Sequence, residues 1–241
     1  MANKFPPGPC VHCRMHVEKP TSDHIFPKSW YPDSTPPNLE KWQMPSCEDC
    51  NRKYGKLEDD LLQRFSLCVD NRALESLGLG TRLVKALDPS RGRDSRDTEI
   101  RVRRAAKLLG QQHVPTGDKP IVQMSNAPSG VAIPVKVRDL ELLGEKIMRG
   151  MIYLHMGLTV GDEFDLFCNA FPRPHPTFDA LLASKGALHQ NGPGIRIRWI
   201  KPGATPLGCT FMIEVFGVYP LRGGVLPKDY PPHTQTVACA S

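Results

Sequence analysis

The sequence of 241 residues has no long apolar run, and its first residues lack the apolar core of a secretory signal. A membrane-spanning helix needs about 20 apolar residues in a row, and a signal peptide needs an apolar stretch close behind the N-terminus. We therefore expect a cytoplasmic protein without a membrane partner. The sequence also has no internal repeat, and the stretch GLGTRLVKALDPSRGR is too loose to be a nucleotide-binding glycine loop.

The composition is that of a soluble globular protein, with 40% hydrophobic and 23% charged residues. The net charge of +6 is concentrated in one segment, because residues 71–110 carry ten Lys or Arg against five Asp or Glu. Such a segment can bind polyphosphate and release counterions. A solvated, partly helical connector is an equally good interpretation.

The eight cysteines are of two kinds. Two CxxC pairs lie about 30 residues apart, and four further cysteines are single. In a chain without a secretory signal, CxxC pairs indicate a metal site and not a disulfide framework. The four thiolates of Cys10, Cys13, Cys47 and Cys50 can close the tetrahedral shell of one Zn²⁺, which would then be structural. His12 and His16 are predicted to be exposed loop residues.

Several secondary-structure elements follow from periodicity and from the positions of proline and glycine. Helices are predicted within residues 50–79 (in two parts), 97–112, 138–158 and 177–185, and paired antiparallel strands within 194–203 and 208–221. In the third helix Lys146 and Arg149 are expected to point to solvent. Residues 113–136 should form short extended pieces, and the tail from 227 should be unstructured.

These elements predict an α+β fold with three parts. Residues 1–70 form a metal-bearing unit, residues 71–112 a basic helical connector, and residues 113–241 an α+β region with antiparallel strands.

The most informative stretch is TSDHIFPKSW, between the two CxxC pairs. A zinc site would bring Asp23 and His24, on an extended segment, close to Asn51, which opens a helix directly after Cys50. Asp23 and Asn51 offer hard oxygen ligands suited to Mg²⁺ or Mn²⁺. His24 offers an imidazole that can accept a proton from water. Together these groups are sufficient for phosphodiester hydrolysis.

The pattern CVHC…DHIFP…N…CEDCNRKYGKLE resembles the HNH endonucleases, in the variant with a four-cysteine zinc knuckle and Asn at the last motif position. The resemblance covers residues 10–60 and implies a ββα-metal fold that cuts DNA with one divalent ion. It implies that His24 is the general base, that Asp23 and Asn51 hold the ion, and that Asn38 orients the base.

Each of these residues also has a purely structural interpretation. Asp23 and His24 could be a helix cap or a surface pair, and Asn51 an N-cap. Glu58, two helical turns beyond Asn51, could join the metal site but is expected to be solvated. Trp30, Tyr31 and Trp42 should cover a small core, with base stacking as the alternative. The candidate nucleic-acid contacts, which could equally be plain surface charge, are Lys53, Lys56, Arg101, Arg103 and Arg104.

Three functions remain open at the level of sequence. The first is a metal-dependent DNA endonuclease, with RNA as another substrate and a homodimer as a means of cutting both strands. The second is a zinc-dependent nucleic-acid-binding protein without catalysis. The third is a nuclease effector of a defence or sensor system, gated by residues 113–241.

Overall fold

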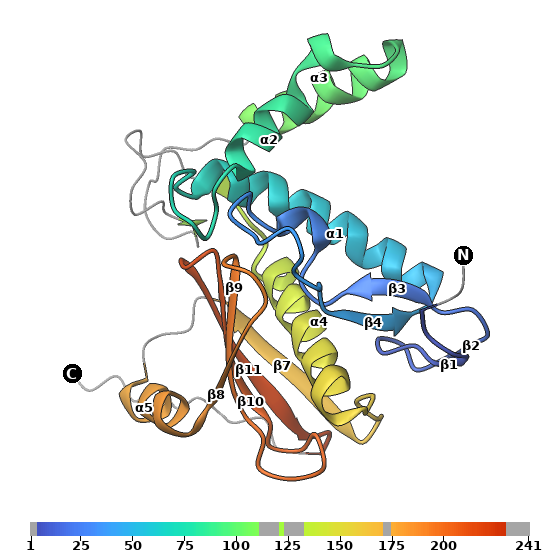
Figure 1. Cartoon of the computed structure of the whole chain (residues 1–241), viewed down its shortest axis with the longest axis vertical. Helices are drawn as coiled ribbons and strands as arrows, with labels where there is room; N and C mark the ends of the chain where they lie inside the picture. Colours follow the sequence, from blue (N-terminus) through green and yellow to red (C-terminus); the bar gives the residue numbers. More distant parts are fainter. Residues whose placement is uncertain (1–3, 111–120, 123–132, 171–174, 230–241) are drawn as a thin grey trace.

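The computed structural model describes residues 4–110, 121–122, 133–170 and 175–229, and it confirms an α+β chain (Figure 1). Within these residues there are five α-helices, and all paired strands are antiparallel. The predictions for most of residues 113–136, for most of the tail and for Cys239 lie outside the described residues. Among the described residues, no helix combines the length and apolar character that crossing a membrane requires.

The N-terminal part consists of two short strand pairs and a long helix. Strand β1 (Gly8–Pro9) pairs with β2 (His16–Val17), and β3 (Thr21–His24) pairs with β4 (Gln43–Ser46). The 3-10 turn η1 (Lys28–Trp30) lies between β3 and β4. Helix α1 (Glu48–Cys68) begins at Cys47, whose Sγ accepts a hydrogen bond from the Cys50 backbone N–H. The acids Glu48 and Asp49 in its first turn favour this start electrostatically.

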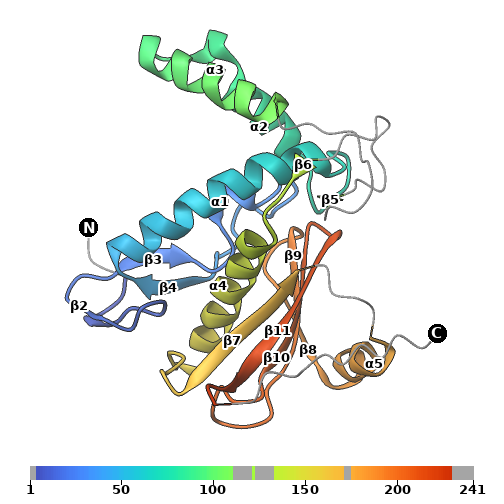
Figure 2. The ribbon, with the colours of Figure 1, turned by 180° about the vertical axis from the view of Figure 1, so that it is seen from behind.

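Two helices form an arm that projects from the rest of the molecule (Figures 1 and 2). Helix α1 accounts for the first part of the helix predicted within 50–79, but the second part is wrong, because residues 69–78 form turns. Helix α2 (Leu79–Leu87) begins only where the predicted range ends. The 3-10 turn η2 (Pro89–Arg91) leads to α3 (Ser95–Leu109). The Asp94 carboxylate caps α3 by accepting a bond from the Asp97 N–H at 2.7 Å.

The C-terminal part is a five-stranded antiparallel sheet with one face covered by helix α4 (Val137–Met156). The strand order is β7-β11-β10-β9-β8. The bounds are β7 (Phe164–Ala170), β8 (Ala187–Gln190), β9 (Ile195–Ile200), β10 (Thr210–Val215) and β11 (Tyr219–Pro227). Helix α5 (Pro176–Lys185) precedes β8, and the short pair β5 (Ile121–Val122) and β6 (Ile133–Pro134) precedes α4. The predicted pairing of β9 with β10 is confirmed.

Helix α4 lies between the N-terminal part and the sheet, and both pack tightly against it (Figure 2). A Cβ atom at Gly144 would overlap Cys168 of β7, and one at Gly150 would overlap Ile25 beside β3. The two glycines therefore let both neighbours approach the helix backbone. As a result α4 has little solvent-facing surface, and ten of its residues are buried.

One continuous hydrophobic core joins the N-terminal part to the sheet. Trp30 is fully buried, stacks on Phe216 from the turn after β10 and meets Phe65 of α1 edge-on. Tyr31 is also buried, so the structural interpretation of Trp30 and Tyr31 is confirmed, whereas Trp42 is only partly buried against this core. The core extends from one end of the described chain to the other, across the boundary expected between residues 70 and 113.

Candidate functional site

Four cysteine sulfur atoms lie together where the loop after β1 meets the start of α1. The Sγ atoms of Cys10, Cys13, Cys47 and Cys50 all lie within 4.8 Å of one another, and those of Cys13 and Cys47 are 3.7 Å apart. In a tetrahedral zinc–thiolate site, with bonds of about 2.3 Å, neighbouring sulfur atoms are about 3.8 Å apart. The cluster could therefore hold a metal ion such as zinc.

The thiols of the cluster differ in acidity. Burial raises the pKa of the Cys10 thiol, but hydrogen bonds from the backbone of Cys13, Cys47 and His12 outweigh it, so the pKa falls to about 7. Burial and the neighbouring thiols raise the pKa of Cys50. Four such close thiols cannot all become thiolates unless a cation offsets their mutual repulsion.

The side chains of β3 alternate between its two faces, and this separates Asp23 from His24. On the face toward α1, the Asn51 amide donates to Thr21 Oγ1 at 3.1 Å. Asp23 lies on the same face and is buried. His24 lies on the other face, where its Nε2 is 2.9 Å from Nε2 of Gln43. The structure therefore brings Asn51 to the face that carries Asp23 and directs His24 away from it.

The prediction that Lys146 points to solvent is wrong, because its side chain is 0% exposed. Its Nζ donates to Asp23 Oδ1 at 2.9 Å, to the His24 carbonyl oxygen at 2.7 Å and to Glu58 Oε1. Glu58 was expected to be solvated, yet its side chain is only 12% exposed. Arg149 is half-buried and contacts Tyr54 and Glu145. Helix α4 is covered on two sides, so these polar groups bind one another.

His12 is the second residue whose predicted exposure is wrong. Its side chain is 3% exposed, its Nε2 lies 2.9 Å from Asp23 Oδ2, and its ring packs at 4.4 Å on Tyr54. Burial lowers the pKa of His12, although Asp23 opposes the shift. His16, by contrast, is exposed as predicted. Each oxygen of the Asp23 carboxylate thus already has a partner within the protein.

Burial raises the pKa of Asp23, but the bonds from His12 and Lys146 outweigh it, so the pKa lies below its usual value. The carboxylate is therefore ionised at neutral pH. It is the centre of a buried charge network of His12, Asp23, Glu58 and Lys146.

His24 is half-buried and surrounded by cations. Burial lowers the pKa of His24; Asp23 opposes this, and Lys146, Lys28 and Lys41 lower it further. The imidazole is therefore neutral at pH 7. Ser22 Oγ donates to Gln43 Oε1 at 2.7 Å, which directs the Gln43 N–H groups toward His24. Gln43 then donates to Nε2, so Nε2 is the basic nitrogen of the ring.

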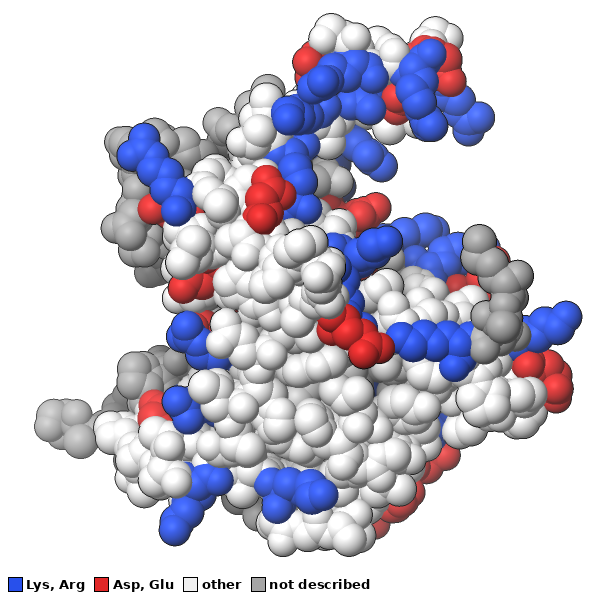
Figure 3. Space-filling model, in the orientation of Figure 1, with Lys and Arg blue, Asp and Glu red and all other residues white. Residues whose placement is uncertain are grey.

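The other predicted site residues lie at the surface. Asn38 is exposed in the loop between η1 and β4, and the hydrogen bond to the His24 ring comes from Gln43 instead. Lys53 and Lys56 are exposed on α1, and Arg104 is exposed on α3. Figure 3 shows Lys and Arg side chains along the α2–α3 arm and on the part of the body that faces it.

Two arginines of the arm have partners within the protein. Arg101 is only 19% exposed, pairs with Asp97 and donates to the backbone carbonyls of Lys85 and Ala86 at 3.0 Å, so it fixes α3 against α2. Arg103 pairs with Glu99.

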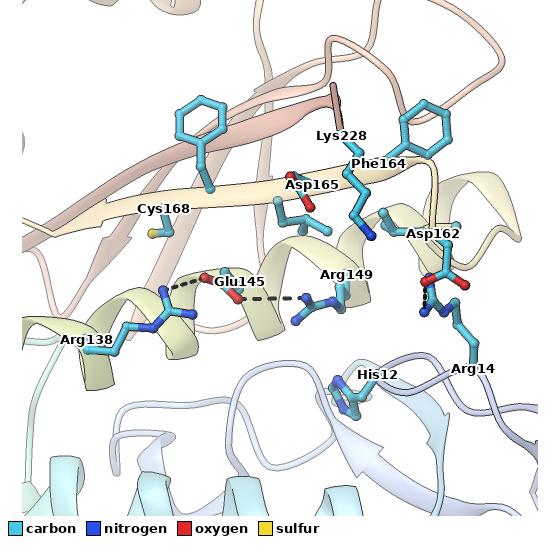
Figure 4. A pocket seen from close by; sticks show the side chains of 14 residues that line it. His12, Arg14, Arg138, Glu145, Arg149, Asp162, Phe164, Asp165, Cys168 and Lys228 are labelled. Atoms are coloured by element: carbon cyan, nitrogen blue, oxygen red, sulfur yellow. Dashed lines mark hydrogen bonds and ion pairs between the residues drawn. The ribbon is translucent and has the colours of Figure 1, made fainter. Parts of the chain in front are cut away.

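A cavity of about 450 Å³ lies between α4, β7 and the loop that carries His12 (Figure 4). Its charged groups largely neutralise one another. Glu145 binds Arg138 at 2.8 Å and Arg149 at 3.7 Å, and Arg14 pairs with Asp162. This cavity is lined by His12 but not by Asp23 or His24.

Comparison of the chain with known protein families, with curated protein sequences and with solved structures found no match.

Replacing Glu58 by glutamine should remove a pH dependence of stability. Burial raises the pKa of Glu58 from 4.5 to about 7, although Lys146 opposes the shift. The stabilisation by the bound proton is complete below about pH 4.5 and is lost as the pH rises through about 7. Between about pH 5 and 8 we expect the free energy of unfolding of the wild type to fall by roughly 1–3 kcal/mol relative to that of Glu58→Gln. Urea unfolding at several pH values measures this difference. Parallel curves for the two proteins would contradict the role of Glu58.

Proposed function

We propose that the chain is an endonuclease of the HNH type that hydrolyses phosphodiester bonds in DNA, with zinc in the four-cysteine cluster. The observation that carries this proposal is His24, a neutral, half-buried imidazole at the end of the first strand of a two-strand and helix unit held by four cysteines. The order of strand β3, strand β4 and helix α1 supports the resemblance to the ββα-metal fold.

The surroundings of His24 suit an anionic polymer. Lys28 and Lys41 lie close enough to lower its pKa, so the phosphate backbone would meet positive charge at this face of β3. Further Lys and Arg side chains lie along the α2–α3 arm and on the part of the body that faces it (Figure 3), and they could also contact phosphate. Of the five predicted contacts, Lys53, Lys56 and Arg104 suit this role best, because Arg101 and Arg103 already bind acids.

In the proposed reaction His24 Nε2 accepts the proton of the attacking water. The Gln43 amide now occupies the position from which that water would donate, so it must be displaced when substrate binds. The Lys146 bond to the His24 carbonyl fixes the backbone that carries the base. General-base catalysis of this kind contributes about 10²- to 10⁴-fold in rate.

The divalent ion that the resemblance implies, Mg²⁺ or Mn²⁺, has suitable ligand types in Asp23 and Asn51. It would neutralise charge on the phosphate and assist the leaving group. The arrangement does not present a ready site, however, because Lys146 and His12 hold both oxygens of Asp23. Among the described residues, the four cysteines are the one group of three or more metal-ligating Cys, His, Asp or Glu side chains. We therefore assign no step to the ion.

The test is cleavage of supercoiled plasmid by the zinc-loaded protein, with and without added Mg²⁺ or Mn²⁺. His24→Ala should cut at least about 100-fold more slowly than the wild type, because the base is lost. Its zinc content and thermal unfolding should stay unchanged. The matched control is His16→Ala, which removes an imidazole that is 63% exposed on β2 and should cut normally. Equal rates for His24→Ala and wild type would refute the role of His24.

Both oxygens of Asp23 already have partners within the protein. This favours a second candidate, a zinc-dependent nucleic-acid-binding protein that does not cut. Such a protein would use the charge network for stability alone and the exposed cations for phosphate contacts. A gel shift with the same plasmid distinguishes the candidates, because this protein would retard DNA and give no ion-dependent product.

A further inference from the structure

We propose that a second cavity, beside Trp42, binds one unpaired nucleobase together with its phosphate, so that the chain engages single-stranded segments of nucleic acid. The inference rests on the proposed function in taking nucleic acid as the ligand. It goes further by naming which part of the ligand binds and where.

The cavity has a volume of about 590 Å³ and lies between three segments that are distant in sequence. The segment before β1 contributes Lys4 and Phe5, residues 40–43 lead into β4, and residues 153–157 end α4. Sites for small organic ligands commonly measure about 300–1,000 Å³, so one nucleotide unit is accommodated.

Four of the ten residues that line this cavity carry aromatic rings. Trp42 meets His155 with ring centroids 6.4 Å apart at 80°, and Phe5 meets Tyr153 at 6.4 Å and 75°. Of these rings His155 is exposed, so it offers a surface on which a further ring can stack. A base stacked on such a ring binds about tenfold more tightly than an abasic unit, whatever the identity of the base.

The His155 wall is held in place from behind. Its ring packs at 4.3 Å on His189, and His189 Nε2 accepts the Trp199 indole N–H at 2.9 Å. Burial lowers the pKa of both His155 and His189, so both rings are neutral at pH 7. Since the wall is already ordered, a ligand loses little free energy in ordering it.

The polar groups of the cavity favour a base that carries a phosphate. Aromatic walls alone would also suit a quaternary ammonium, but Lys4 and Lys41 would repel a cation. Glu40 pairs with Lys4 at 3.6 Å, so Lys41 is the lining cation that has no acidic partner among the described residues. Gln43 adds an amide that can bond a base edge, and this same amide bonds His24. The cavity therefore adjoins the proposed general base.

A base in a duplex cannot use such a site, because its faces are covered by neighbouring bases and its edge by its partner. A strand without a partner exposes all of these groups. The ligand class is therefore single-stranded nucleic acid.

The experiment measures fluorescence anisotropy of a labelled single DNA strand of about ten nucleotides, with zinc-loaded full-length protein and no other divalent ion. The comparison strand has the same length and charge but is abasic throughout. We expect the strand with bases to bind about tenfold more tightly, the effect of one stacked base. Equal affinities for the two strands would overturn the proposal.

Variants locate the effect in this cavity. His155 is exposed, so His155→Ala should fold normally and should reduce binding of the strand with bases about tenfold, without changing binding of the abasic strand. His155→Phe should restore most of the difference, and His16→Ala should behave like the wild type. A loss that is equal for both strands in His155→Ala would also overturn the proposal.

These results are independent of cleavage. A chain that prefers bases but cuts no plasmid keeps this inference and loses the nuclease proposal. A chain that cuts plasmid but does not distinguish the strands loses this inference alone.

Discussion

Replacing Cys47 by serine should release the metal and unfold the N-terminal part of the chain. Cys47 supplies one of four clustered sulfur atoms and also caps α1, so its loss removes both a ligand and a helix start. Structural zinc sites have apparent binding free energies of about 10–16 kcal/mol, and this free energy contributes to folding. We therefore expect zinc content to fall from one ion per chain to near zero and cooperative thermal unfolding to be lost.

The short strand pairs explain why Cys47→Ser should cause a large loss of stability. Strands β1 to β4 are short, at two to four residues each, and short isolated strand pairs are unstable in water. The cluster ties the loop after β1 to the start of α1, and so it fixes both ends of this part. Zinc analysis of the purified protein and circular dichroism with increasing chelator measure the effect.

The control for this experiment is Cys209→Ser, which changes a buried thiol outside the cluster. It should keep its zinc, although it can lose some stability. A Cys47→Ser protein that retains one zinc ion and melts like the wild type would show that the cluster does not hold the fold together.

Replacing Lys146 by methionine should destabilise the protein by about 3–5 kcal/mol, the cost of breaking a buried ion pair by removing one partner. Methionine preserves the length of the side chain and removes its charge. Asp23 and Glu58 would then be two buried carboxylates without their shared ammonium. Urea unfolding at pH 7 gives the free energy directly.

Two further variants separate lost charge from lost packing. Lys185→Met removes an exposed lysine of α5 and should change stability by less than about 0.5 kcal/mol. A double variant combines Lys146→Met with Glu58→Gln. It should be more stable than Lys146→Met alone, because one of the two uncompensated carboxylates is removed. If Lys146→Met unfolds at the same urea concentration as the wild type, the network contributes nothing to stability.

Features with a local sequence pattern were predicted well. The spacing of the cysteines predicted their cluster, because two CxxC pairs can supply the four thiolates of one tetrahedral zinc site. Periodicity predicted α4, with a buried face at helical spacing. The first four residues of that face are buried, but the fifth, Leu154, is exposed because it lies near the end of the helix; the set is Leu140, Leu143, Ile147, Met151 and Leu154. Alternation predicted β9 and β10, whose register pairs Ile197 with Ile213.

The charge network was not predicted, for a physical reason. Periodicity assigns one buried face to a helix and places charged residues on the other. Helix α4 has two covered faces, so Lys146 is enclosed by β3 and α1. Its partner Asp23 lies 123 residues earlier in the chain, and no local pattern reports such a distance. For Glu58 the sequence did contain a signal. It lies two helical turns beyond Asn51, and this spacing places it on the helix face that carries the network.

The separation of His24 from Asp23, in contrast, could have been inferred from the sequence, because both residues were expected on an extended segment. The motif places Asp23 and His24 next to each other in sequence, and a strand necessarily directs adjacent side chains to opposite sides. Their separation follows from β3 extending to His24.

The position of α4 limits how the chain can be divided or recombined. A fragment of residues 1–112 would contain the four clustered cysteines, Asp23 and His24. It would leave Ile25 uncovered, because Gly150 of α4 now lies against that side chain. It would also retain Asp23 and Glu58 without the lysine that neutralises them. The N-terminal part therefore cannot be transferred to another protein on its own. A chimaera that keeps it must keep α4 as well, in the same orientation.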